Sequence, residues 1–120
     1  MSKKTLVIGA SNNPERYSYL AVNRLLAKGH EVVALGRQGD EVAGVAIDKD
    51  PKPYEAVDTV TLYLNPKNQE QYYDYISSLS PKRVIFNPGA ENEEFENILE
   101  SKGIKTQEAC TLVLLSTGQF

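Results

Sequence analysis

Near its N-terminus the chain reads Thr5-Leu6-Val7-Ile8-Gly9-Ala10-Ser11-Asn12-Asn13-Pro14-Glu15-Arg16-Tyr17-Ser18. The first four residues form a continuous apolar, β-rich run, which is typical of a strand buried on both faces. The polar and small residues that follow end this run and lead into a helical pattern over 16–28, closed by Gly29. This order of strand, polar connection and helix predicts the first part of a β-α-β unit.

The same alternation continues along the whole chain. Because residues 36–53 are rich in glycine and proline, we expect mostly loop there, with one short extended piece at 45–47. Repeated β-α units predict a three-layer α/β fold, a Rossmann-like doubly wound parallel sheet of about five strands. With the strands numbered along the chain, the expected order is 3-2-1-4-5, and ligands should bind where the order reverses. Further strands are expected at 31–35, 59–64, 83–86 and 104–106, and further helices at 66–79 and 91–102.

The composition is that of one soluble domain, which we expect to span residues 1–120. A net charge of -3 lacks the basic footprint of a nucleic-acid binder. The longest apolar run, residues 112–115, is too short for a membrane helix. With one cysteine and no signal-peptide pattern, the protein is expected in the cytoplasm. The carboxylates are scattered without metal-ligand spacing, so we expect no metal site.

The first connection carries groups suited to an anionic ligand. Gly9 leaves room for a close approach of the backbone, and the start of the helix offers unpaired N–H groups. Arg16 adds a charge-assisted donor. The last helix instead begins with acidic residues over 91–94, which already satisfy its dipole and repel an anion. Phosphate groups are therefore expected at the first helix, near Gly9, Ala10, Ser11, Asn12, Arg16, Tyr17 and Ser18.

A dinucleotide is a weaker fit to this connection. The G-x-G-x-x-G fingerprint needs two further glycines, and Ala10-Ser11 and Pro14 stand in that part of the pattern. The acidic residue that would bind an adenosine ribose after the second strand is also absent, and Gly36-Arg37 stands there instead. Because a cation suits a ribose phosphate, an NADP-linked oxidoreductase remains an alternative.

The loops after the other strands meet the first connection at the carboxyl edge of the sheet. Their small and uncharged residues suit the neutral arm of an extended cofactor whose phosphates sit at the first helix. Coenzyme A is such a molecule, and we predict it as the ligand. The candidate residues in these loops are Arg37, Gln38 and Gly39, then Tyr63, Leu64, Asn65 and Pro66, and finally Asn87, Pro88 and Gly89.

The first connection also resembles a known family, the small CoA-binding proteins related to the CoA-binding domain of the succinyl-CoA synthetase alpha subunit. The family's first turn reads approximately G-A-S-x-x-P-x-R-x-S, matched here by Gly9, Ala10, Ser11, Pro14, Arg16 and Ser18. Gly89, Asn92, Glu93 and Cys110 resemble further family positions. The resemblance implies that the loops after the first two strands hold the nucleotide end and that later loops line the pantetheine arm. It implies binding of CoA or an acyl-CoA and no particular reaction.

Three functional hypotheses follow. The leading one is a CoA-binding module that catalyses nothing on its own, because the predicted cleft holds no nucleophile with a base. The others are the NADP-linked oxidoreductase and an interaction protein that has lost its ligand. We expect Cys110 to be a buried small hydrophobe and His30 to lie in a surface turn at the far edge of the sheet. The apolar tail at 111–115 has no obvious place in a five-stranded sheet, so it is expected to dock on the core or to form a homodimer.

Overall fold

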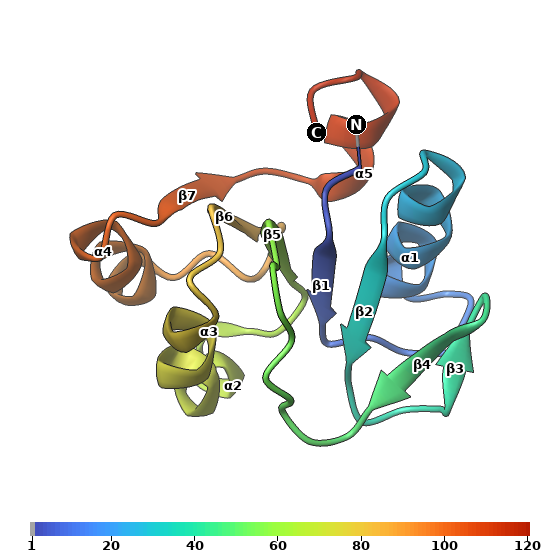
Figure 1. Cartoon of the computed structure of the whole chain (residues 1–120), viewed down its shortest axis with the longest axis horizontal. Helices are drawn as coiled ribbons and strands as arrows, with labels where there is room; N and C mark the ends of the chain where they lie inside the picture. The colour runs from blue at the N-terminus through green and yellow to red at the C-terminus, as the bar shows by residue number, and fades with distance from the viewer. Residues whose placement is uncertain (1) are drawn as a thin grey trace.

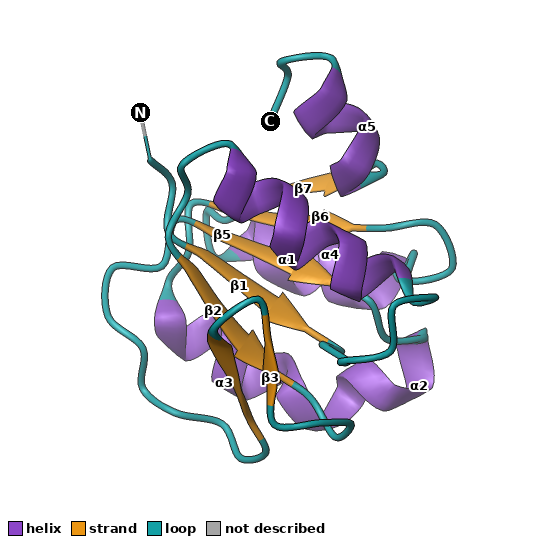
Figure 2. Ribbon diagram, turned by 90° about the vertical axis from the view of Figure 1, so that its right-hand side faces the viewer, coloured by secondary structure: helices purple, strands orange, loops and turns teal. Residues whose placement is uncertain are grey.

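The computed structural model describes residues 2–120 and contains one seven-stranded sheet between two layers of helices (Figures 1 and 2). The sheet order is β3-β4-β2-β1-β5-β6-β7, and every neighbouring pair is parallel except β3 with β4. The expected Rossmann-like α/β class is confirmed. The strands are β1 (Thr5–Ile8), β2 (Val32–Leu35), β3 (Glu41–Val42), β4 (Val45–Asp48), β5 (Thr59–Leu62), β6 (Arg83–Phe86) and β7 (Lys105–Glu108).

The helices divide between the two faces of the sheet because side chains alternate along each strand. Leu6 and Ile8 of β1 point into one hydrophobic cluster with α3 and α4, whereas Val7 points into the other with α1 and α5. The central strands β1 and β5 are buried over their whole length. The helices are α1 (Tyr17–Ala27), α2 (Pro66–Gln69), α3 (Tyr73–Leu79), α4 (Glu93–Ser101) and α5 (Thr111–Ser116), with a 3-10 turn at Glu70–Tyr72.

The number and order of strands predicted from the sequence were wrong. β5 pairs with β1 and does not lie outside β2, because β4 occupies the place beside β2. The short extended piece expected at 45–47 is confirmed as β4, and it pairs with the unpredicted strand β3 in a hairpin whose two turn residues, Ala43 and Gly44, have φ of 51° and 84°. Positive φ at both positions gives the turn whose twist matches a hairpin. Gly44 therefore lies in the turn that joins the two strands.

Two other expected elements also differ in detail. The helix predicted over 66–79 is divided by the 3-10 turn, and at the division the Gln69 side chain is buried. Its Nε2 donates to the carbonyl oxygens of Leu64 and Ala90, at 2.8 and 2.7 Å. The last strand runs from Lys105 to Glu108 and not over 104–106. No helix within residues 2–120 has the length and apolar character needed to cross a bilayer.

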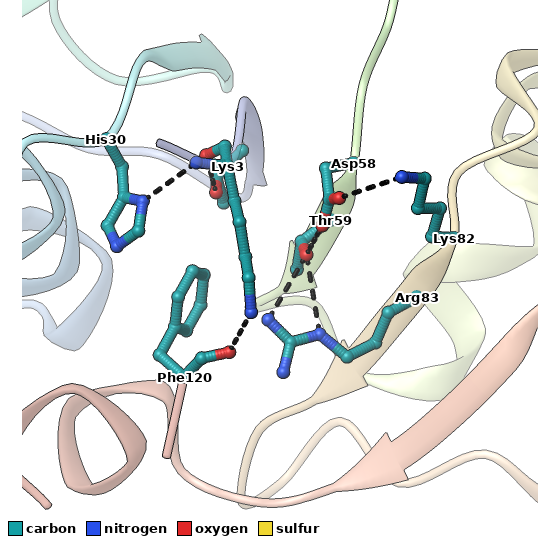
Figure 3. Close-up of polar contacts among 8 residues, drawn as sticks. Lys3, His30, Asp58, Thr59, Lys82, Arg83 and Phe120 are labelled. Carbon is teal, nitrogen blue, oxygen red and sulfur yellow. Dashed lines mark hydrogen bonds and ion pairs between the residues drawn. The ribbon is translucent and has the colours of Figure 1, made fainter. Parts of the chain in front are cut away.

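The C-terminal tail has a place inside this fold. α5 packs beside α1, and Leu114 and Leu115 are buried. At the amino edge of the sheet, the ring of Phe120 lies 5.0 Å from the ring of His30 (Figure 3). The side chain of Lys3 donates to the Phe120 carbonyl at 2.6 Å, so both ends of the chain lie together.

The same contacts change the interpretation of His30. It is half-buried and not a plain surface-turn residue, because its Nδ1 accepts a 3.0 Å hydrogen bond from the backbone N–H of Lys3. It does lie at the amino edge of the sheet, on the side opposite the cleft described next.

Candidate functional site

A cleft of about 480 Å³ opens where β1, β2 and β5 end, beside the start of α1. The arrowheads of these strands point the same way, so the loops that follow them gather at one edge (Figure 2). Parallel α/β sheets bind ligands at this edge. From the candidate residues the cleft collects Gly9, Ala10, Ser11, Arg16, Tyr17, Ser18, Arg37, Gln38, Tyr63, Leu64, Asn65, Pro88 and Gly89.

Four candidate residues lie outside the wall of this cleft. Asn12 is exposed, and Gly39 is packed so closely against it that an added Cβ would lie 2.2 Å from Asn12 Cγ. Pro66 is the exposed first residue of α2. Asn87 is buried and lines a second, smaller cavity. These residues therefore shape the loops or the neighbouring cavity.

The loops after β1 and β2 are joined into one wall. The backbone N–H groups of Gly9 and Ala10 both donate to the Leu35 carbonyl, at 2.9 and 3.0 Å. Ser11 pairs with Gln38 as an isolated parallel bridge, and Ser11 Oγ donates to Gln38 Oε1 at 3.0 Å. These bonds hold the predicted nucleotide-end loops at a fixed separation.

Gly36 is the point where these loops come closest. A Cβ built on it would lie 2.1 Å from the Ala10 carbonyl oxygen, which real Cβ atoms do not approach. Only glycine fits there without movement of the backbone. Sequence reasoning noted Gly36 as a departure from the NAD pattern, and its packing role required the tertiary structure.

The N-terminus of α1 faces the cleft without a protein cap. Arg16 is the N-cap residue, but no side chain among residues 2–120 accepts a hydrogen bond from the first turn, and that turn holds no acidic residue. The backbone N–H groups of Tyr17 and Ser18 donate to no acceptor within residues 2–120. Such a helix end presents partial positive charge and unpaired donors to an anion.

The start of α4 is the opposite case. The Asn92 side chain accepts from Phe95 N–H at 3.1 Å and so caps the helix. Glu93, Glu94 and Glu96 lie in its first turn. The start of α1 therefore attracts an anion more strongly than the start of α4 does.

Two arginines add positive charge at the cleft. Arg16 and Arg37 are both exposed, and neither forms an ion pair in the part of the chain that the structure describes. Arg16 belongs to the first loop and Arg37 to the second, so they approach the cleft from different strands. Unpaired guanidinium groups in this position suit phosphate oxygens.

Several wall residues were not foreseen. Leu35 and Gly36 lie in the wall because the loops after β1 and β2 come close together there. Ala90 lies in the wall at the end of the turn after β6. The segment α2 and its 3-10 turn contribute Asn68, Gln71 and Tyr72. Nothing in the local sequence separates these from an ordinary solvent-facing helix, because their position depends on how α2 packs.

A second cavity of about 210 Å³ lies next to the cleft. Tyr17, Tyr63 and Pro88 line both spaces, which places the two cavities side by side. The remaining walls of the second cavity are Asn87, Cys110 and Leu112. The expectation that Cys110 is a buried core residue was wrong, since it is half-buried and forms part of a cavity wall.

Tyr63 carries the one buried side-chain polar atom without a partner among residues 2–120. Burial raises the pKa of Tyr63 to about 12, so the hydroxyl keeps its proton at neutral pH. A buried O–H without an acceptor is costly and uncommon. Tyr63 lines both cavities, but the hydroxyl oxygen has almost no accessible surface and lies beside the Thr61 and Thr111 hydroxyls.

Asn87 connects the cavity floor to the core. Its Nδ2 donates to Thr61 Oγ1 at 2.7 Å and to the Leu62 carbonyl at 2.9 Å. Its Oδ1 accepts from Thr111 N–H at 2.9 Å. Because every polar atom of the amide has a protein partner, Asn87 positions β5, β6 and α5 relative to one another.

The fold and this edge define a Rossmann-like ligand-binding domain. The chain belongs to the CoA binding domain family, which it matches over residues 3–116, and this confirms the resemblance noted from the first turn. No curated protein is significantly similar in sequence.

Solved structures agree with this fold. A crystal structure of an uncharacterized protein is 54% identical, with a TM-score of 0.98, and the match covers 100% of this chain and 99% of that one. A conserved hypothetical protein from Pyrococcus furiosus is 29% identical over 88% of this chain and 91% of its own, with a TM-score of 0.76. A protein from Thermus thermophilus, 24% identical with a TM-score of 0.87 over 99% and 91% of the two chains, shares the fold.

Proposed function

We propose that the protein binds coenzyme A or an acyl-CoA at the carboxyl edge of its sheet. The observation that carries the proposal is the uncapped N-terminus of α1, with the exposed Arg16 beside it, at one side of a 480 Å³ cleft. Membership of the CoA binding domain family supports the same ligand class. The phosphate oxygens would accept hydrogen bonds from the backbone N–H groups of Tyr17 and Ser18 and from the Arg16 guanidinium.

The rest of the cofactor would follow the shape of the cleft. Arg37 and Gln38 lie on the β2 side and would contact the nucleotide end. Leu64 and Asn65 after β5, with Gly89 after β6, offer uncharged surface to the pantetheine arm. The arm would therefore run from the first helix across β5 toward the β6 turn.

We propose further that the domain performs no reaction by itself. The cleft wall within residues 2–120 includes neither histidine nor cysteine, and His30 lies at the other edge of the sheet. The presence of a single cysteine is consistent with a reducing, cytoplasmic location, which we also propose.

Val113 of α5 remains 55% exposed. We propose that this helix forms a contact in a homodimer, and native mass spectrometry tests this.

Isothermal titration calorimetry with CoA and NADP tests the proposed ligand. CoA is expected to bind more tightly than NADP, and Arg16→Ala is expected to weaken CoA binding about tenfold, as for loss of one charged hydrogen bond. Arg24→Ala is the matched control, because Arg24 is an exposed arginine in the last turn of the same helix.

Other results would support the alternatives. Tighter binding of NADP would favour the oxidoreductase. A dimer that binds neither cofactor would favour an interaction protein that has lost its ligand, and either outcome would overturn the proposal.

A further inference from the structure

The two sides of the cleft are held together in different ways. On one side, the loops after β1 and β2 are joined by backbone hydrogen bonds and by the pair of Ser11 and Gln38. On the other side lie the loops after β5 and β6, residues 63–65 and 87–90. Within the described chain, no backbone hydrogen bond joins these two loops. Because both line the cleft, a side chain must fix the distance between them.

Gln69, the last residue of α2, supplies that link. Its side chain is fully buried, and its Nε2 donates to the carbonyl oxygens of Leu64 and Ala90, at 2.8 and 2.7 Å. Leu64 follows β5, Ala90 follows β6, and both lie in the cleft wall. Among residues 2–120, neither carbonyl accepts from another donor. Since a primary amide has two N–H groups, one nitrogen ties the two loops together.

Asn92 fixes the orientation of the Gln69 amide. Asn92 Nδ2 donates to Gln69 Oε1 at 3.0 Å, so Nε2 is directed toward the two carbonyls. The Asn92 amide is fixed in turn, because its Oδ1 accepts from Phe95 N–H and its Nδ2 also donates to Tyr73 Oη at 2.8 Å. A buried network in which every member is satisfied favours one arrangement. The spacing of the two loops is therefore set by these side chains as well as by the sheet.

These loops form the uncharged part of the cleft wall. Arg16 and Arg37 belong to the loops after β1 and β2, whereas residues 63–65 and 88–90 include no charged side chain. If the phosphates bind at the start of α1, the pantetheine arm is the part that passes between the loops after β5 and β6. Its contacts depend on the loop spacing, because a gap of 0.5–1 Å already loses about a quarter to a half of the van der Waals attraction.

We propose that Gln69 is a positioning residue, which holds the loops after β5 and β6 at the spacing that the uncharged arm of the cofactor requires. This inference rests on the proposed function. Gln69 is fully buried and is absent from the cleft wall, so it acts through Leu64 and Ala90 and does not touch the ligand. Changes at Gln69 should therefore weaken ligands that carry the arm and spare the nucleotide end alone.

Isothermal titration calorimetry with two ligands tests this difference. CoA carries the arm, and adenosine 3′,5′-bisphosphate carries nucleotide phosphates without it. Gln69→Met keeps the length of the side chain and removes the amide that joins the loops. It is expected to weaken CoA binding about tenfold, comparable to the loss of one hydrogen bond, and to leave binding of the bisphosphate within about twofold.

Two further variants separate positioning from stability. Ile76→Val trims a buried α3 side chain that lies outside the cleft wall, so it should lower stability in urea unfolding and change neither affinity. Gln69→Asn keeps the amide and shortens the side chain by one methylene, so the amide can reach only one of the two carbonyls. It should weaken CoA selectively, and it carries the test if Gln69→Met does not fold.

Hydrogen exchange followed by mass spectrometry gives a readout that needs no ligand. In Gln69→Met, exchange should become several-fold faster in peptides that cover 63–69 and 87–92, because the two loops are no longer joined. Peptides that cover 9–12 and 35–38 should be unchanged, since backbone hydrogen bonds hold those loops. Unchanged exchange in both regions would contradict the link between the loops.

The outcomes separate this inference from the function on which it rests. If the Gln69 variants bind CoA as tightly as the unaltered protein does, the positioning role is wrong and CoA binding stands. Equal weakening of CoA and the bisphosphate would indicate a general structural role and would also overturn the inference. If the bisphosphate gives no heat with the unaltered protein, a CoA loss equal to that of Ile76→Val counts against the inference and a larger loss supports it. If no CoA compound binds the unaltered protein, both proposals fail.

Discussion

Gly36→Ala should both destabilise the folded protein and weaken CoA binding at the cleft. The new Cβ would lie 2.1 Å from the Ala10 carbonyl oxygen and 2.9 Å from its carbon, so the two loops must separate by about 1 Å. Neither backbone can move freely, because Ala10 N–H donates to Leu35 and Gly36 N–H donates to Asp48. The substitution adds a steric overlap without backbone strain, because φ of Gly36 is not positive.

The expected magnitude follows from these contacts. Overpacking of this kind costs about 1–3 kcal/mol, and weakening one of the two hydrogen bonds adds about 1 kcal/mol. A loss of about 2–4 kcal/mol should lower Tm by roughly 8–16 °C in a domain of this size. Because both loops line the cleft, CoA affinity should fall as well.

Urea unfolding and calorimetry with CoA measure the two effects. Gly44→Ala is the control, because a Cβ there meets nothing within 4 Å while φ is +84°. It should cost about 1 kcal/mol through backbone strain and leave CoA binding unchanged. If Gly36→Ala stays within about 0.5 kcal/mol of the unaltered protein and binds CoA normally, the argument from the loop contact is refuted.

Three other changes test the core and the titrating groups. Asn87→Ala should cost about 2–4 kcal/mol in urea unfolding because it leaves Thr111 N–H unpaired, and a cost below about 1 kcal/mol would contradict the role of this amide. Burial and the neighbouring carboxyl of Glu108 raise the pKa of Glu96 to about 7, so its contribution to stability is lost as pH rises from about 4.5 through 7. Glu96→Gln should therefore melt a few degrees above the unaltered protein at pH 8 and lose this advantage near pH 5, whereas exposed Glu94→Gln should show no such change with pH. Burial and Lys3 lower the pKa of His30, so stability falls as pH drops below about 6.5, and melting curves for His30→Gln should decline less between pH 7 and 5; parallel declines would contradict this.

The first strand and its connection were predictable because their signals are local. A continuous apolar run ending at Gly9 indicates a buried strand, and the polar residues before α1 indicate a ligand edge. The acidic residues at the start of α4, compared with Glu15 balanced by Arg16 just before α1, also predicted the contrast between the two helix ends. Each of these features depends on neighbours only a few residues away.

The extended piece at 45–47 was predicted, but its place in the sheet beside β2 was not. β4 is only partly buried, and its hairpin turn contains a glycine that also suits a loop. What makes it a strand is pairing with β2 through Ala34 and Leu35, which are more than ten residues distant along the chain. α5 likewise owes its position to packing against α1.

The sequence by itself determined the α/β class and the family, and it predicts the loop at which an anion should bind, because periodicity and helix-end chemistry depend on consecutive residues. Only the tertiary structure decided the strand order, the close contact at Gly36 and the second cavity beside Tyr63. These arise where segments far apart in the chain meet, and whether such segments leave a void or an unpaired hydroxyl depends on packing that no local pattern specifies.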